Sequence, residues 1–219
     1  MAARAEQKEI LTVRTSMIIA AAALAAVTGH AVAQQAPAPA AQAAAAASVQ
    51  SGDYALDKGH AKILWSVSHF GFSTYYGEFT DFDAKLTLDG ANPAASKLSV
   101  TVQTASANGH NPALEKHLQS PDFFNTAKFP TATFVSTAVR PTSATTADVT
   151  GDFTLLGVTR PLTLKVTFNK AAENMAKKYT TGFSAEGVVK RSDYGMTYAV
   201  PAVSDDVKLV ISGEFNKVD

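Results

Sequence analysis

The feature that most constrains the fold is a period of two in hydropathy, which starts near Asp53 and recurs as far as Phe215. In the run from Ala61 to Phe70, one face carries apolar residues and one histidine, namely Ile63, Trp65, Val67 and His69. Successive side chains of a β-strand point to opposite faces, so this alternation is typical of a strand with one buried face. We therefore predict an all-β domain.

Turn residues separate the first runs from one another. Gly71 interrupts the first run, and the next, from Thr74 to Leu88, ends at Asp89-Gly90. An Asp-Gly pair between two alternating runs favours a tight β-hairpin. The pattern resumes from Lys97 to Ala105. These runs predict an antiparallel meander.

Similar runs follow to the end of the chain, and with the short segment from Tyr54 to Asp57 included we count eight strands. An even number of antiparallel strands can close into a barrel, which removes exposed strand edges. The interior of an eight-stranded barrel is either filled by side chains or wide enough for one small ligand. The 219 residues fit one such domain.

One short helix interrupts the strands. Asn111 is a favourable N-cap, Pro112 suits the first helical position, and Glu115 lies in the first turn, where the helix dipole favours an anion. The helix is expected to last about two turns and to end near Ser120.

The segment from Ser120 to Thr137 joins this helix to the next strand. It carries an aromatic pair, Phe123 and Phe124, which needs a surface to bury against, and it breaks at Phe129-Pro130. We predict an internal flap or plug beside the barrel interior, and we expect the function to lie there.

Composition excludes several classes of function. The formal net charge is zero and no run of Lys or Arg exceeds two residues, so the electrostatic footprint of a nucleic-acid-binding protein is absent from the sequence. The chain contains no cysteine, which excludes disulfides, thiolate metal sites and cysteine nucleophiles.

The N-terminal residues resemble a secretory signal peptide. Arg4, Lys8 and Arg14 precede an apolar run from Met17 to Val27, and Ala31-Val32-Ala33 matches a cleavage site. The apolar run is too short for a membrane anchor, which needs about 20 residues. We expect residues 1–33 to be removed, the mature chain to have no membrane span, and the protein to reside in the periplasm.

Residues 34–51 are rich in Ala, Pro and Gln, and they predict a disordered linker ahead of a domain at 52–219. Pro37 and Pro39 oppose a helix there, although a short alanine-rich helix from Ala40 to Ala47 is an alternative.

The sequence leaves open whether the barrel is filled or hollow. Small residues predicted to face inward alternate with large ones; the small set is Ala84, Gly151, Ala185, Gly187 and Gly213. Small inward residues leave space, but the same alternation occurs in packed small barrels.

Several motifs together resemble the YceI-like family of secreted bacterial polyisoprenoid-binding proteins. They are Ser-Val-Ser-His69, Gly77-Glu-Phe79, His117-Leu118, Ser-Pro-Asp122-Phe123-Phe124, Phe129-Pro-Thr-Ala-Thr-Phe134, Gly151-Asp-Phe-Thr-Leu-Leu-Gly157-Val-Thr-Arg-Pro161 and Arg191-Ser-Asp193-Tyr-Gly195. The resemblance implies a lipocalin-like barrel whose long internal apolar pocket holds a polyprenyl phosphate, an isoprenoid quinone or a fatty-acid derivative. Leu114 and Gln119 depart from the basic residues that many members have there.

On this resemblance we expect the tail of the ligand to lie in a channel lined by Trp65, Val67, Phe82, Leu86, Phe134, Phe153, Leu155 and Phe183. Phe123 and Phe124 would close or shape the channel. His69 and Arg191 are candidates for contact with the head group. For His69 the alternative is a hydrogen-bonded core histidine, and for Arg191 it is a salt bridge with Asp193 that fixes a turn.

Other functions have weaker support. His110, Glu115 and His117 could form a metal site only if their faces agreed, which a helix starting at Asn111 does not ensure. No G-x-S-x-G or H-E-x-x-H motif occurs, so we expect no enzyme activity, no cofactor and no metal. A packed barrel that acts through its surface, in stress response or adhesion, is the alternative function. A homodimer is left open.

Overall fold

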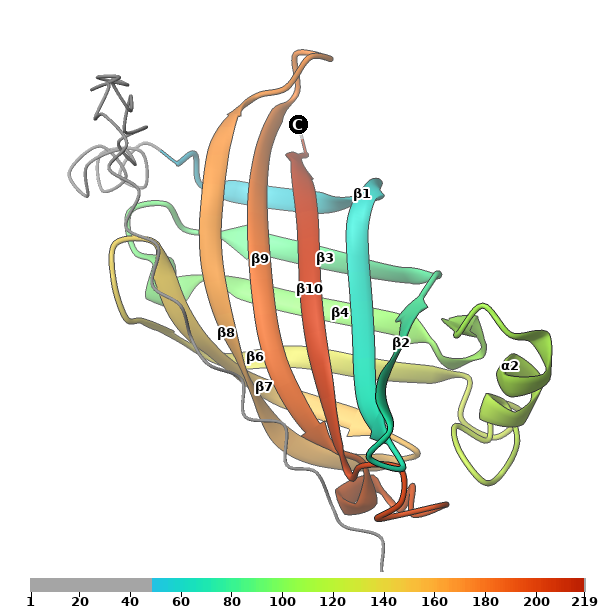
Figure 1. Ribbon diagram of the computed structural model, residues 1–219. Coiled ribbons are helices and arrows are strands. Elements are labelled where there is room, and N and C mark those ends of the chain that lie inside the picture. The colour runs from blue at the N-terminus through green and yellow to red at the C-terminus, as the bar shows by residue number, and fades with distance from the viewer. Residues whose placement is uncertain (1–48, 219) are drawn as a thin grey trace, which may run out of the picture. The chain divides into compact units, whose positions relative to one another are not determined.

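Ten β-strands and one short α-helix make up the part of the chain that the computed structural model describes, residues 49–218 (Figure 1). The strands are β1 (Gly52–His69), β2 (Ser73–Phe79), β3 (Phe82–Leu88), β4 (Lys97–Gln103), β5 (Ala107–Asn108), β6 (Thr131–Pro141), β7 (Thr146–Leu155), β8 (Val158–Glu173), β9 (Tyr179–Lys190) and β10 (Asp206–Lys217). The predicted signal peptide, and the predicted linker up to residue 48, lie outside the described residues.

Eight of these strands close into an antiparallel barrel. The order around the ring is β10-β9-β8-β7-β6-β4-β3-β1, and pairing between β1 and β10 completes it. The other two strands, β2 and β5, extend the sheet from the second half of β1. The predicted all-β eight-stranded barrel is therefore confirmed.

The predicted strand boundaries differ from the structure on the first hairpin. The runs at 54–57 and 61–70 belong to one strand, β1, and the run at 74–88 is divided into β2 and β3 at Thr80-Asp81. β1 pairs with β3 through Gly52–Ala55 and with β2 through Ile63–His69. The first half of β1 thus pairs with β3 and β10, while its second half pairs with β10 and β2.

Bulges allow the long strands to bend around the barrel. The β1–β10 register shifts between Leu56 and Ala61, the β6–β7 register between Ser136 and Ala138, and the β8–β9 register between Phe168 and Lys170. A bulge bends its strand and increases the local twist. The gap that the sequence shows after Asp57 is the first of these bulges.

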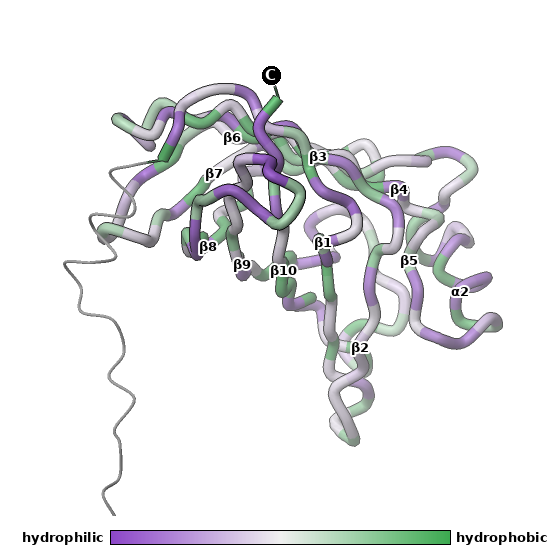
Figure 2. The backbone as a smooth tube through the Cα atoms, turned by 90° about the horizontal axis from the view of Figure 1, so that it is seen from above, coloured by the Kyte–Doolittle hydropathy of each residue, from purple (hydrophilic) through white to green (hydrophobic). Residues whose placement is uncertain are grey.

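The period of two in the sequence sorts the side chains between the inside and outside of the barrel. Hydrophilic and hydrophobic residues succeed one another along the strands (Figure 2). On β1 the buried residues include Ile63 and Trp65, while Lys62 before them and Leu64 between them are exposed. His69, which we expected on the inward face, is exposed at the end of the strand.

The predicted helix is present as α2 (Pro112–Leu118), and the Asn111 side chain accepts hydrogen bonds from the amides of Ala113 and Leu114. It lies beside β5 (Figure 2). Three short 3₁₀ helices complete the regular structure, at Pro93–Ala95, Thr104–Ser106 and Arg191–Tyr194. Among residues 49–218, no helix has the length and apolar character needed to cross a membrane.

Candidate functional site

The barrel interior contains two adjoining cavities. The larger, which we call the helix-side cavity, has a volume of about 420 Å³, and its lining includes residues of α2 and the aromatic pair that follows it. The smaller, the turn-side cavity, has a volume of about 240 Å³ and reaches the β3–β4 and β6–β7 turns. The interior is therefore not completely filled by side chains.

Four aliphatic side chains separate the two cavities. They line both, and we call them the waist: Ile63, Val100, Leu164 and Ile211. They come from β1, β4, β8 and β10, and Ile63 is the cross-strand partner of Ile211. A ligand long enough to occupy both cavities must pass between these side chains.

The structure divides the predicted lining residues between the two cavities. The helix-side cavity is lined by Trp65, Val67, His69, Phe123, Phe124, Phe134, Phe153, Leu155 and Arg191. Phe82, Leu86 and Phe183 line the turn-side cavity instead. The residues expected along one channel thus lie on both sides of the waist.

Two of the small residues predicted to leave space, Gly151 and Gly187, leave it only for neighbouring side chains. The other three line the turn-side cavity as predicted: Ala84, Ala185 and Gly213. A Cβ atom on Gly151 would lie 2.5 Å from Cζ of Phe134, and one on Gly187 would lie 2.6 Å from Cδ2 of Leu164. These positions are already occupied by the larger side chains, so the open volume lies elsewhere. Gly187 has a further effect, because it allows Leu164 of the waist to lie against β9.

Three aromatic rings join the helix to the loop at 195–205 at the mouth of the helix-side cavity. The ring centroids of His117 and Phe123 are 4.9 Å apart, those of His117 and Tyr198 are 5.1 Å apart, and those of Phe123 and Tyr198 are 5.3 Å apart. All three residues line the cavity. This aromatic cluster therefore forms one side of the opening.

The segment from Ser120 to Thr137 lies beside the interior, as the aromatic pair suggested. Backbone hydrogen bonds fold it back on the helix, including one from the Phe124 amide to the Leu118 carbonyl at 3.0 Å. His117 Nε2 and Asp122 Oδ2 lie 2.9 Å apart and join the helix to the segment. Phe124 also packs edge-on to Phe79 of β2, with centroids 5.7 Å apart. Because these contacts hold the segment to the helix and to β2, it forms a fixed wall of the cavity and not a free flap.

Arg191 has a different role from the predicted salt bridge with Asp193. Its side chain is 3% exposed, and its guanidinium donates to four backbone carbonyls of the 195–205 loop, those of Met196, Tyr198, Val203 and Ser204. Asp193 accepts a hydrogen bond from Arg160 through its own carbonyl. The predicted bridge is therefore wrong, and Arg191 fastens the loop that carries Tyr198.

The carboxylate near Arg191 is that of Asp205. It accepts hydrogen bonds from the Ser192 amide at 2.8 Å and the Ser192 hydroxyl at 2.7 Å. Burial acts to raise the pKa of Asp205, but these hydrogen bonds and the charges of Lys190 and Arg191 bring that pKa below its ordinary value. Asp205, the last residue of the loop, is thus a carboxylate that joins the end of the loop to Ser192.

His69 lies at the opening, where its ring meets that of Phe70 edge-on and is tilted against that of Tyr75. Its ring centroid is 4.8 Å from that of Phe70 and 6.3 Å from that of Tyr75. Because His69 is exposed and lines the helix-side cavity, the alternative of a hydrogen-bonded core histidine does not describe it.

The sequence interpretation missed the contribution of the 195–205 loop. Met196, Tyr198 and Val203 all line the helix-side cavity. The loop follows neither a strand nor a helix period, so hydropathy gave no signal for it. The last motif that carries the resemblance ends at Gly195, one residue before the loop begins to line the cavity.

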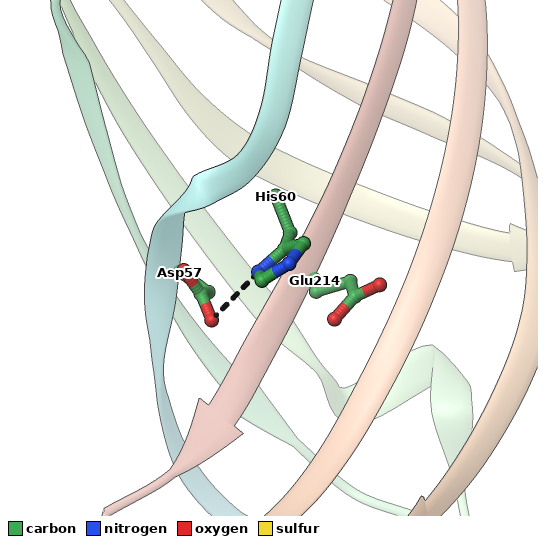
Figure 3. A group of neighbouring side chains, drawn as sticks. All are labelled: Asp57, His60 and Glu214. Carbon is green, nitrogen blue, oxygen red and sulfur yellow. Dashed lines mark ion pairs between the residues drawn. The ribbon is translucent and has the colours of Figure 1, made fainter. Parts of the chain in front are cut away.

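A group of possible metal donors lies at the bulge of β1, where Asp57, His60 and Glu214 approach one another within 4.8 Å (Figure 3). Asp57 Oδ2 is 3.2 Å from His60 Nδ1, and the Asp57 carboxylate also accepts from the Gly59 and Asn216 nitrogens. The hydrogen bond with His60 lowers the pKa of Asp57, and the same bond raises the pKa of His60. The Asp57 carboxylate is therefore already hydrogen-bonded within the bulge, and the group lies outside both cavities.

The alternative metal site of His110, Glu115 and His117 is not assembled. His110 Nε2 lies 3.9 Å from Glu78 Oε1, whereas His117 pairs with Asp122. Among residues 49–218, these three do not form a group of donors within reach of one ion.

Comparison with known proteins decides the family. Residues 54–215 match the family description "YceI-like domain". The chain belongs to the YceI-like family. A UPF0312 protein of Ectopseudomonas mendocina is 42% identical over 166 residues, which are 75% of this chain and 87% of that protein. Protein YceI of Escherichia coli is 41% identical over 171 residues, 77% of this chain and 89% of the relative.

Solved structures show the same fold. BcnA of Burkholderia cenocepacia aligns with a TM-score of 0.67 at 23% identity, over 73% of this chain and 98% of that one. The YCEI protein of Campylobacter jejuni aligns with a TM-score of 0.62 at 32% identity, over 68% and 88%. A polyisoprenoid binding domain from Saccharophagus degradans, implicated in plant cell wall breakdown, aligns with a TM-score of 0.56 at 12% identity, over 75% and 98%.

Proposed function

We propose that this YceI-like protein binds an isoprenoid or a related long-chain amphiphile inside its barrel and serves as its carrier in the periplasm. The observation that carries the proposal is the pair of adjoining cavities, which are lined mainly by aliphatic and aromatic side chains. A packed barrel that acts only through its surface gives no reason for such cavities. The tail would fill the helix-side cavity and reach the turn-side cavity through the waist.

The energetics of such a complex are favourable. Burial of apolar surface contributes about 0.8 kcal/mol per methylene, but the costs of binding offset much of this gain. At about 0.3 kcal/mol per heavy atom, a tail of about 40 carbons would contribute about −12 kcal/mol, which corresponds to nanomolar affinity. Apolar contact alone is therefore sufficient to retain the ligand.

A solved structure with the same fold supports the proposed class of ligand. The solved structure from Saccharophagus degradans is described as a polyisoprenoid binding domain, and this chain shares its fold. The family match and the cavities are consistent with a ligand of that class. The candidates are a polyprenyl phosphate, an isoprenoid quinone or a fatty-acid derivative.

The polar end of the ligand belongs at the mouth of the helix-side cavity, on this proposal. His69 and His117 offer imidazole groups there, with 38% of the His117 side chain exposed. Arg191 contributes to the shape of the mouth, since its guanidinium already donates to four carbonyls. Head-group contact by His69 is the stronger of the two assignments made from the sequence.

Export and the absence of catalysis complete the proposal. The basic lead, apolar run and Ala-Val-Ala site of residues 1–33 support export to the periplasm. A carrier function requires an apolar container rather than a nucleophile and a base, and the lining residues supply such a container.

Native mass spectrometry of protein purified from the periplasm tests this proposal, followed by organic extraction and lipid identification. The expected result is a one-to-one adduct that organic extraction removes. Phe134→Asp places a charge in the lining and should abolish the adduct, whereas Val135→Asp, on the exposed face of the same strand, should retain it. Circular dichroism establishes that each variant is folded, and Phe134→Tyr provides a milder change if Phe134→Asp unfolds. A bare polypeptide mass, unchanged after incubation with polyprenyl phosphates and quinones, would overturn the carrier proposal.

A further inference from the structure

The turn between β1 and β2 exposes two phenylalanines, and we call residues Phe70, Gly71 and Phe72 the hairpin tip. Phe70 is 54% exposed and Phe72 is 91% exposed. Phe70 has a φ of 51° and Gly71 a φ of 73°. A bulky residue in this left-handed region is strained, and glycine or asparagine would adopt it more easily. A strained position is therefore occupied by a large apolar side chain that faces water.

The tip belongs to a stretch without charge. From residue 63 to residue 77 the chain contains no Asp, Glu, Lys or Arg, although such residues form 17% of the whole sequence. The same stretch adds Tyr76, which is 67% exposed. Exposed strands and hairpins commonly carry charges that prevent unwanted association. An uncharged aromatic hairpin suits contact with an apolar or interfacial partner.

The tip is continuous with the mouth of the helix-side cavity. Phe70 lines that cavity together with Tyr198, which is 47% exposed. The Phe70 amide donates to the Ala202 carbonyl at 2.7 Å, and His69 forms a bridge with Val203. A surface that contacts the tip therefore also meets the opening through which a ligand would enter.

We propose that the hairpin tip docks on the surface of a lipid bilayer and presents the mouth of the helix-side cavity to the membrane. This inference rests on the proposed function, because a ligand with a long apolar tail resides in a bilayer and must be collected there. Aromatic side chains partition favourably into the membrane–water interface. Since the tip carries no charge, docking should need no anionic lipid and should change little with salt, unlike docking through basic clusters.

The opposite end of the barrel provides a matched control. Met175, in the β8–β9 turn, is 103% exposed. In Figure 1 the β8–β9 turn lies at the upper end of the barrel and the β1–β2 turn at the lower end. Charged residues flank Met175 at Glu173, Lys177 and Lys178. The effect on membrane binding of removing one exposed apolar side chain can thus be compared between Phe72 at the tip and Met175 at the opposite end.

The experiment is flotation of the purified protein with phosphatidylcholine vesicles, which contain no isoprenoid. We expect wild type and Met175→Ser to float with the vesicles equally in low and high salt. The double variant Phe70→Asn, Phe72→Ser should lose binding by about tenfold or more, since both changes remove apolar contact. Asparagine tolerates the left-handed backbone, so the turn should be retained; the single variant Phe72→Ser should give an intermediate loss.

Three results would overturn membrane docking: failure of the wild type to float, equal flotation of wild type and double variant, or an equal loss in Met175→Ser. Sedimentation of the same samples addresses a second copy of the chain as partner. A dimer that dissociates in the double variant, without any change in flotation, would assign the tip to self-association instead.

A parallel assay separates this inference from the proposed function. Binding of an isoprenoid alcohol in detergent micelles can be followed through Trp65, the one tryptophan of the chain, which lines the cavity. The single variant Phe72→Ser, at a residue that does not line the cavity, should bind in micelles as the wild type does. Flotation of the wild type without any binding in micelles would reject the carrier proposal and leave the docking surface in place.

Discussion

The two ends of the barrel interior are built differently. The helix-side cavity is walled by aromatic rings and by two irregular segments, the one after α2 and the loop at 195–205, which meet at His117, Phe123 and Tyr198. The turn-side cavity is rimmed by the short β3–β4 and β6–β7 turns. Irregular segments can place aromatic and imidazole groups at an opening, whereas short turns mainly connect strands. On the carrier proposal, this difference favours the polar end of the ligand in the first cavity and the end of its tail in the second.

The difference between the two ends depends most on Arg191, because its guanidinium holds the 195–205 loop at the helix-side cavity. Arg191→Met would leave four carbonyls without their donor and should reduce the free energy of unfolding by roughly 3 kcal/mol. Arg160→Met, which removes an exposed arginine with one bond to the Asp193 carbonyl, is the matched control and should cost much less. Urea unfolding measures both. Equal stability of the two variants would contradict the role assigned to Arg191.

The waist should separate ligands by length. Val100 lines both cavities, so Val100→Phe would extend a ring into the space between them. Affinity for a tail of about 40 carbons should fall by about tenfold to a hundredfold, while a tail of about 15 carbons that fits the helix side alone should bind nearly unchanged. Titrations with both tails measure this selectivity.

Thr101→Phe, on the exposed face of the same strand, serves as the control for the waist variant. An equal loss of affinity for both tails in Val100→Phe would contradict a waist that selects ligands by length. Gly187→Ala provides an independent change, because the added methyl would displace Leu164 toward the interior. It should move selectivity in the same direction by a smaller amount.

The contribution of Asp205 to the stability of the 195–205 loop should depend on pH. Because the folded-state pKa of Asp205 is lowered, its stabilisation is present above the ordinary aspartate pKa and is lost as pH falls through the folded value. Asp205→Asn keeps one acceptor for two Ser192 donors and should cost about 1 kcal/mol at neutral pH, with less difference from wild type in acid. Asp206→Asn, on the exposed neighbour, should have little effect. Thermal unfolding across the acid range would detect the contrast, and parallel curves for all three proteins would rule it out.

The bulge pair of Asp57 and His60, which lies outside both cavities, should have the smallest effect. The raised pKa of His60 means that its stabilisation is fully present below the ordinary histidine pKa and disappears as pH rises through the folded value. His60→Gln should therefore lower the melting temperature slightly at about pH 5.5 and not at about pH 8.5. Ligand affinity should stay unchanged, and a change in affinity would mean that the bulge influences the cavities.

Local patterns predicted the elements of this fold but not their relations in space. The period of two identified inward residues such as Trp65 and Phe134, and the Asn111 cap identified the helix, because both signals depend on adjacent residues. The waist joins side chains from β1, β4, β8 and β10. Its composition depends on the stagger of strands around the closed barrel, which no single run of sequence contains.

Arg191 shows the same limit on a smaller scale. The nearest carboxylate in the sequence, Asp193, suggested a salt bridge, but the backbone of a later loop folds around the guanidinium instead. Side chain to backbone contacts leave no mark in composition, so Met196 and Tyr198 could not be assigned to the cavity beforehand. His69 kept its expected strand but lies at its end, where alternation no longer determines burial.

The way Arg191 fastens its loop bears on how the protein responds to ionic strength. Dissolved ions screen the attraction between exposed charges, and most strongly between charges farther apart than a Debye length of about 8 Å at physiological salt. The acceptors around Arg191 are neutral carbonyl oxygens, and the side chain is 3% exposed. The rim of the helix-side cavity should therefore keep the same shape at low and high ionic strength, and on the carrier proposal the ligand should stay bound across that range.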